Sequence, residues 1–120
     1  MLIEITEKDG ICLVRFEGRF ISGPEPEYIR ARDEIAQRRS EKVLADFREV
    51  SQIGSTGVGF VVGIYASVRK NPRGRFVLVG LQRRVREVFD ITRLSAVIPL
   101  AEDMASGLAA LHSGSSAAAG

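Results

Sequence analysis

The stretch Ser51-Gln52-Ile53-Gly54-Ser55-Thr56-Gly57-Val58-Gly59 organises the rest of the chain. A β-branched, strand-like run ends at Phe47, just before it, and a long apolar run begins inside it and ends at Arg69-Lys70. We interpret the stretch as a loop that opens a helix, with Ser55 at the N-cap, because a serine hydroxyl there accepts an unpaired backbone N–H. The first turn of a helix also favours negative charge, so a serine at this place can carry a phosphate without disturbing the fold.

Two strands are predicted upstream of this stretch, over residues 2–6 and 11–17. The Lys8-Asp9-Gly10 sequence between them predicts a hairpin turn, because Asp-Gly tolerates the left-handed backbone of a tight turn. A loop over 21–26, rich in Gly and Pro, leads to a helix over 27–39. The residues of this helix that recur at near-helical spacing are Tyr28, Ala31, Ile35 and Arg38.

Strands and helices alternate downstream. We predict strands over 42–47, 75–79 and 96–99, a turn at 71–74, and helices over 82–90 and 101–111, the last with Met104, Leu108 and Leu111 facing inward. The helix that follows Ser55 has an apolar stripe of Val58, Val61, Val62, Tyr65 and Val68. The order β-β-α-β-α-β-α-β-α predicts an α/β fold, with helices packed against a mixed sheet.

The composition fits one small domain. The chain has 120 residues, of which 45% are hydrophobic and 27% charged, with a net charge of +2. We expect residues 1–112 to form the domain and the Ser, Gly and Ala tail at 113–120 to be disordered. We expect no signal peptide, because the first residues show no basic and apolar leader pattern, and no apolar run is long enough to span a membrane. Cys12 has no disulfide partner and is expected in the core, which fits a cytoplasmic protein.

Basic residues outnumber acidic residues in the second half of the chain. Between Ser67 and Arg93 there are eight, namely Arg69, Lys70, Arg73, Arg75, Arg83, Arg84, Arg86 and Arg93. Such a face could meet an acidic partner or a phosphate. A solvated surface is the simpler interpretation, and we favour it.

Enzymatic constellations are absent from the sequence. His112 is the single histidine and lies beside the tail, so neither a catalytic triad nor a metal cluster can be built on it. The glycines after Ser55 are not followed by Lys-Ser or Lys-Thr, and their spacing does not match GxGxxG, so neither nucleotide loop is predicted. We expect no catalytic residue, no metal, no other cofactor and no nucleic-acid partner.

Four segments together resemble a STAS domain of the bacterial anti-sigma factor antagonist type. They are residues 43–47, 53–59, 75–80 and 85–94, and the element order agrees over about residues 2–111. In that family the loop Asp-Ser-Ser/Thr-Gly-Leu-Gly opens the second helix, and its first serine is phosphorylated. The resemblance implies that Ser55 is the phosphorylation site, with Thr56 as the fallback.

The resemblance also implies partners and a partner-binding surface. An anti-sigma factor that is itself a serine kinase would bind the unphosphorylated protein and so release a sigma factor, and a serine phosphatase would reset the switch. The implied partner-binding residues are Gly54, Ser55, Thr56, Gly57, Val58, Arg19 and Ile21. Gly54 stands where the family motif has aspartate, and Ile21 stands where the Gly-x-Leu-Asp pattern ends in aspartate.

Two further interpretations stay open. The chain could be a constitutive STAS subunit of a stress-signalling scaffold or of a lipid-transport ABC complex, which the loss of both aspartates favours. It could also be an enzyme or a small nucleotide-binding protein, although no general base and no phosphate loop supports that interpretation.

Overall fold

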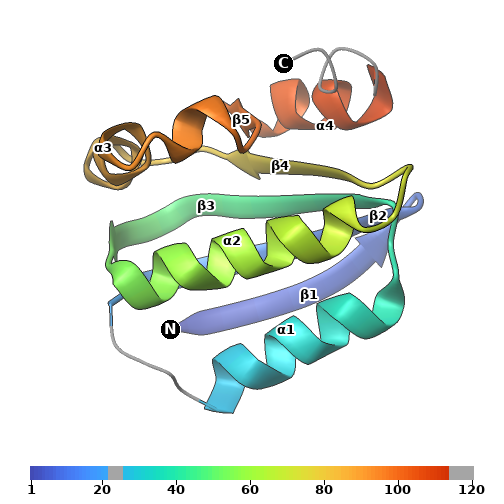
Figure 1. The fold of residues 1–120 in the computed structure, drawn as a ribbon, viewed down its shortest axis with the longest axis horizontal. Helices are drawn as coiled ribbons and strands as arrows, with labels where there is room; N and C mark the ends of the chain where they lie inside the picture. Colours follow the sequence, from blue (N-terminus) through green and yellow to red (C-terminus); the bar gives the residue numbers. More distant parts are fainter. Residues whose placement is uncertain (22–25, 114–120) are drawn as a thin grey trace.

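A five-stranded mixed sheet forms the centre of the protein, seen in a computed structural model that describes residues 1–21 and 26–113 (Figure 1). Its strands are β1 (Leu2–Lys8), β2 (Ile11–Phe20), β3 (Lys42–Ile53), β4 (Arg75–Val79) and β5 (Leu100–Ala101), and their spatial order follows the chain. Strand β1 pairs antiparallel with β2, whereas the other pairs are parallel. The predicted α/β fold with a mixed sheet is therefore confirmed.

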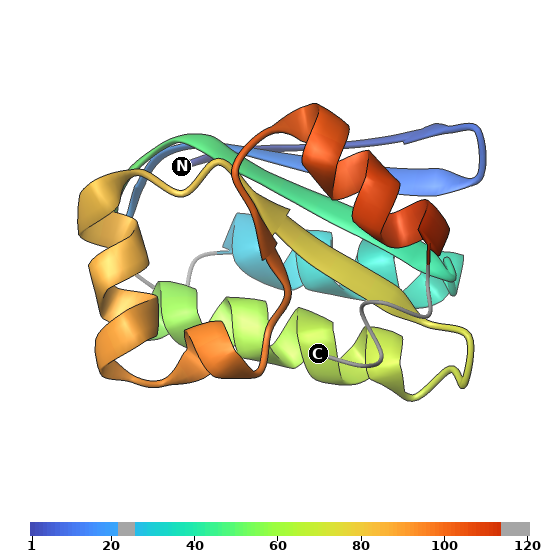
Figure 2. The ribbon, with the colours of Figure 1, turned by 90° about the horizontal axis from the view of Figure 1, so that it is seen from above.

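Helices cover both faces of the sheet unequally. They are α1 (Pro26–Arg38), α2 (Ser55–Arg69), α3 (Arg83–Ile91) and α4 (Met104–Ser113), with a 3-10 helix, η1 (Leu94–Ala96), after α3. Helices α1 and α2 lie side by side on one face, and α4 lies on the opposite face (Figures 1 and 2). Because successive parallel strands advance in one direction with right-handed crossovers, the connecting helices collect on the same face.

The β1–β2 hairpin closes with a two-residue turn. Asp9 and Gly10 both have positive φ, at 54° and 79°, and Lys8 pairs with Ile11. This is the geometry that Asp-Gly favours in tight hairpins, so the predicted turn is confirmed.

Aromatic rings fill the core beneath α1 and α2. The rings of Phe16 and Phe47 have centroids 4.9 Å apart, those of Phe20 and Phe60 are 5.4 Å apart, and Tyr28 lies 4.9 Å from Phe20. Such tilted and edge-on pairs add to the stability that burial alone gives. The cluster holds the first turns of α1 and α2 against the end of β2.

A second, smaller core lies beneath α4. Leu111 is fully buried there against Ile11, Leu44, Val77 and Val79, and Met104 and Leu108 pack on the same cluster. The predicted inward face of the last helix is confirmed. Cys12 is also fully buried, in the larger core, as expected, and burial raises the pKa of its thiol.

Several predicted strand boundaries are wrong. Strand β3 continues to Ile53 instead of ending at residue 47, because β2 also extends, to Phe20, and keeps pairing with it. Two register shifts between the strands each place one extra residue in β3, so β3 does not keep a regular alternation there. The last strand is β5, not residues 96–99, because η1 occupies Leu94–Ala96 and the buried Ile98 anchors the segment that follows.

The buried stripe of α2 also differs from the prediction. Val62 is exposed, and Val58 and Tyr65 are only half-buried, whereas Gly57, Phe60, Val61, Ile64 and Val68 are buried. Phe60 turns the helix in this way because its ring enters the aromatic cluster. On α1, Arg38 is exposed and bonds Glu34 and Glu7.

The remaining helix ends shift by one to three residues. Helix α1 spans Pro26–Arg38 rather than 27–39, α3 spans Arg83–Ile91 rather than 82–90, and α4 spans Met104–Ser113 rather than 101–111. Helix α4 starts late because Asp103 accepts the Ser106 N–H at 2.8 Å and caps it. The predicted loop at 21–26 and the predicted tail at 113–120 lie mostly outside the described residues, so the domain division stays a prediction.

Candidate functional site

The loop before α2 is placed by the ends of two paired strands. Arg19 of β2 pairs with Gln52 of β3, and Phe20 pairs with Ile53. The Gly54 N–H then donates to the Phe20 carbonyl at 2.9 Å, so the pairing continues one residue beyond β3. Residues that are more than 30 positions apart in the sequence, Ile21 and Gly54, are thereby brought together at one edge of the sheet.

Ser55 is the first residue of α2 and is exposed. The predicted N-cap position for Ser55 is wrong, because Gly54 is the N-cap, with φ −117° and ψ −169° and no side-chain cap. The extended strand continues to Ile53, so the chain turns at Gly54, and helical geometry begins one residue earlier than expected. Thr56 is the second helical residue rather than the first, and it is half-buried.

The N-terminus of α2 offers donors toward solvent beside the Ser55 hydroxyl. The Val58 N–H makes the first helical hydrogen bond, to the Gly54 carbonyl at 3.0 Å. The N–H groups of Ser55, Thr56 and Gly57 precede that bond and have no partner within the helix. Together with the helix dipole they favour a negative group on the Ser55 side chain.

Gly57 lets the first turn of α2 lie directly on the core. A Cβ atom at Gly57 would lie 2.7 Å from Ile53 Cγ1, 2.8 Å from the Phe20 carbonyl oxygen and 2.9 Å from Phe20 Cγ. These separations are shorter than real side chains tolerate. The absence of a side chain at Gly57 therefore sets how close Ser55 lies to the end of β2.

The Ser55 loop itself is uncharged, and the surface beside it is partly apolar. Ile21 is 46% exposed, and a Cβ atom built on Gly54 would lie 3.6 Å from the Ile21 Cα atom. Arg19 is exposed on the neighbouring strand, whereas Val58 is half-buried against the core. All of the predicted partner-binding residues thus belong to one edge, although Gly57 itself is buried and acts by positioning.

A partly buried ion pair that the sequence did not predict lies on β3, between the buried Asp46 and the exposed Arg48. The Asp46 carboxylate accepts the Arg48 guanidinium at 2.8 and 3.0 Å and the Arg48 N–H at 3.0 Å. Burial acts to raise the pKa of Asp46, but the bonds from Arg48 outweigh it and hold that pKa below its usual value. An Asp-x-Arg pattern in a strand, which places both side chains on one face, was the available signal.

The basic residues between Ser67 and Arg93 are partly paired within the protein. Arg83 lies beside Glu87 and Arg86 beside Asp90 in ion pairs along α3, and Arg69 and Arg75 donate to the Gly74 carbonyl. His112 lies 3.3 Å from the Lys42 ammonium. Among residues 1–21 and 26–113 no group of three metal-ligating side chains is found, and no helix is long and apolar enough to cross a membrane.

The chain is similar to known proteins both in a family model and in sequence. The STAS domain family model matches residues 3–107. The anti-sigma-B factor antagonist of Listeria monocytogenes is 34% identical over 99 residues, which are 82% of this chain and 86% of that protein.

Solved structures share the fold at lower identity. An anti-sigma factor antagonist from Mycobacterium paratuberculosis superposes with a TM-score of 0.84 at 19% identity, over 92% of this chain and 93% of the other. The Bacillus cell fate determinant SpoIIAA in its phosphorylated form gives a TM-score of 0.65 at 18% identity, over 82% and 90% of the two chains.

Proposed function

Because the chain belongs to the STAS domain family, with curated relatives that are anti-sigma factor antagonists, we propose that it is itself an anti-sigma factor antagonist switched by phosphorylation of Ser55. In this proposal the unmodified protein binds an anti-sigma factor serine kinase in the cytoplasm and frees a sigma factor. The kinase phosphorylates Ser55, the complex dissociates, and a serine phosphatase restores the binding form. The chain acts as a regulator without a catalytic site of its own.

The exposed position of Ser55 at the start of α2 is the observation that carries the proposal. Its hydroxyl lies on the surface, where a kinase active site can reach it, whereas Thr56 beside it is half-buried. The phosphate would gain the N–H groups and the dipole of a 15-residue helix. The fold therefore accepts the modified and unmodified forms alike, which a reversible switch requires.

The change of charge falls on the surface that a partner would cover. A phosphate adds about −1.5 to −2 charges at pH 7. Because neither Gly54 nor Ile21 carries a charge, the unmodified loop presents a neutral hydroxyl beside an exposed apolar side chain. A partner surface complementary to that loop would have to desolvate a dianion after phosphorylation, which is unfavourable without a new cationic partner.

Binding titrations of two variants against the candidate kinase test the proposal. Ser55→Ala should bind within about twofold of wild type, since it removes only an exposed hydroxyl, and Ser55→Asp should bind at least tenfold more weakly. Ser51→Asp is the matched control, because Ser51 is an exposed serine on β3 four residues earlier, and it should bind like wild type. Equal binding by Ser55→Asp and wild type would refute the switch.

A constitutive subunit is the second candidate function. The neutral Gly54 and the exposed Ile21 support it, because an apolar edge without acidic groups suits a permanent protein contact. A pull-down from the native cell separates the two candidates. A histidine-kinase-like ATPase in the pull-down would support the switch, and large scaffold or transporter subunits would support the constitutive role.

A further inference from the structure

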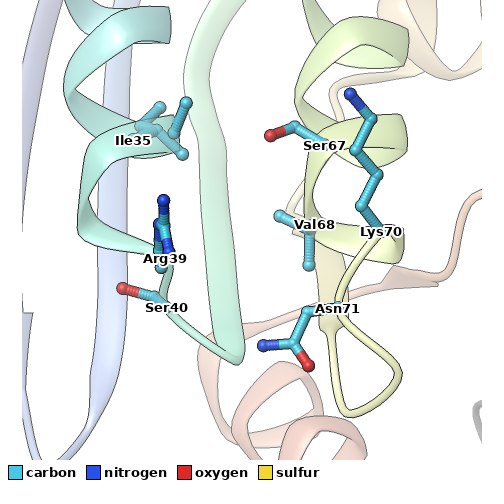
Figure 3. A pocket seen from close by; sticks show the side chains of 8 residues that line it. Ile35, Arg39, Ser40, Ser67, Val68, Lys70 and Asn71 are labelled. Atoms are coloured by element: carbon cyan, nitrogen blue, oxygen red, sulfur yellow. The ribbon is translucent and has the colours of Figure 1, made fainter.

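A cationic cavity opens between the C-terminal ends of α1 and α2. Its volume is about 350 Å³, which is at the lower end of the range for small-molecule sites. The lining residues come from both helices and the turns that follow them, namely Ile35, Ala36, Arg39, Ser40, Ser67, Val68, Lys70 and Asn71 (Figure 3). It lies at the far end of α2 from Ser55 and is independent of the function proposed above.

Within the part of the chain that the structure describes, the two cations of this cavity, Arg39 and Lys70, have no acidic partner. Arg39 and Lys70 make no ion pair or side-chain hydrogen bond with any other described residue, and no lining residue is acidic. Other cavities differ in this respect. The one beside Gly80 is lined by Arg48 and Arg86, which pair with Asp46 and Asp90, and by Glu102.

Neutral donors face the same cavity. In Figure 3 the Ser67 hydroxyl of α2 and the Asn71 amide, in the turn after α2, both point toward α1. The Asn71 Oδ1 atom accepts the Arg73 N–H at 2.9 Å, which leaves the amide nitrogen as the free group. Ser40, Ser67 and Asn71 are each half-buried, so they can donate to a ligand that is itself partly withdrawn from water.

The backbone holds Arg39 in an unfavourable conformation. Its φ is +49°, in the left-handed region that the residue after a helix often adopts and that glycine adopts at the lowest cost. Glycine is the usual residue in this conformation. An arginine here instead places a guanidinium group at the rim of the cavity.

Charge and shape together select the ligand. The helix C-termini bring partial charges of about −0.5 each, so the two cations leave a net positive site. Ile35 and Val68 provide an apolar wall behind the donors. We propose that this cavity binds a small organic phosphate monoester, with the phosphate between Arg39 and Lys70 and the organic group against Ile35 and Val68.

An NMR titration of the full chain with phenyl phosphate tests this proposal. Saturable shifts should appear on the amides of Ala36, Ser40, Ser67 and Asn71. Inorganic phosphate should bind more weakly, because it lacks the apolar group, and benzyl alcohol should not bind, because it lacks the charge. Equal affinity for inorganic phosphate would overturn the assignment of an organic ligand.

Variants make the test specific. Arg39→Gly should weaken phenyl phosphate binding about fivefold or more, as expected for one lost exposed charge pair, while raising the melting temperature because the strain is relieved. Lys70→Gln should weaken binding similarly, and the double variant should not saturate. Arg84→Gln, an exposed arginine on α3, should change affinity less than twofold. Persistence of the shifts in the double variant, or an equal loss with Arg84→Gln, would overturn the proposal.

Discussion

Replacing Gly57 by alanine should destabilise the protein, although alanine is the better helix former. The added Cβ would meet Ile53 Cγ1, the Phe20 carbonyl oxygen and Phe20 Cγ, all within 3.0 Å. One of these atoms belongs to the backbone of β2, which also receives the Gly54 N–H, so it cannot move without breaking that bond. Overpacking of this kind costs about 1–3 kcal/mol.

Two other glycines of α2 provide the comparison that isolates this cost. Gly59 and Gly63 are exposed, and a Cβ atom at either would meet nothing within 4 Å. Alanine there should stabilise by about 0.5–1 kcal/mol through helix propensity alone. Both variants gain the same helix propensity. The difference between the unfolding free energies of Gly57→Ala and Gly59→Ala should therefore equal the overpacking cost, about 1–3 kcal/mol.

Urea denaturation followed by circular dichroism at 222 nm measures all three variants. With an m-value of about 1–3 kcal/mol per molar urea, a difference of 2 kcal/mol separates the midpoints by roughly 1 M. A Gly57→Ala protein as stable as Gly59→Ala would refute the close contact between α2 and β2. It would also remove the argument that Gly57 positions Ser55.

Two further outcomes are expected. Asp46→Asn should lower the unfolding free energy by about 1–3 kcal/mol at pH 7 through the lost charge-assisted bonds to Arg48. Because the folded pKa of Asp46 is depressed, its contribution is complete above the unfolded pKa of about 3.9 and disappears as pH falls through the folded pKa, so urea midpoints of the two proteins should converge in acid. Gly54→Asp should raise the melting temperature in a thermal scan, because an N-cap carboxylate is worth roughly 0.5–1 kcal/mol over glycine and the space beside Ile21 admits its Cβ. Gly54→Asn should give only the hydrogen-bond part of that gain, and a lower melting temperature for both variants would contradict the assignment of Gly54 as the N-cap.

The order of elements was predictable from sequence because alternation and helical spacing are local signals. The Asp9-Gly10 turn and the α4 face with Leu108 and Leu111 follow from such signals and are confirmed. The end of β3 was not predictable, because residues 48–53 follow an irregular, bulged register and are strand only through their pairing with the end of β2. The length of β3 therefore depended on its pairing with β2 and not on a local sequence signal.

The candidate site was likewise predictable only in part from the sequence. The sequence identified Ser55 as a residue at a helix N-terminus, and only its position in the first turn was displaced by one. The proximity of Ile21 to Gly54 agrees with the family resemblance, whereas the tight contact at Gly57 and the strained Arg39 needed three-dimensional structure. A glycine in a sequence indicates that the backbone is conformationally free there, but it does not indicate which other residues pack against it.

Phosphosite mapping after incubation with the cognate kinase and ATP tests the central claim most directly. Trypsin should release residues 49–69 as one peptide, which contains Ser51, Ser55, Thr56 and Ser67, so fragmentation must assign the site. We predict a single phosphate on Ser55 in the wild-type protein and none on the Ser55→Ala peptide. A phosphate on Ser51 or Ser67, or no phosphate at all, would contradict the switch at the N-terminus of α2.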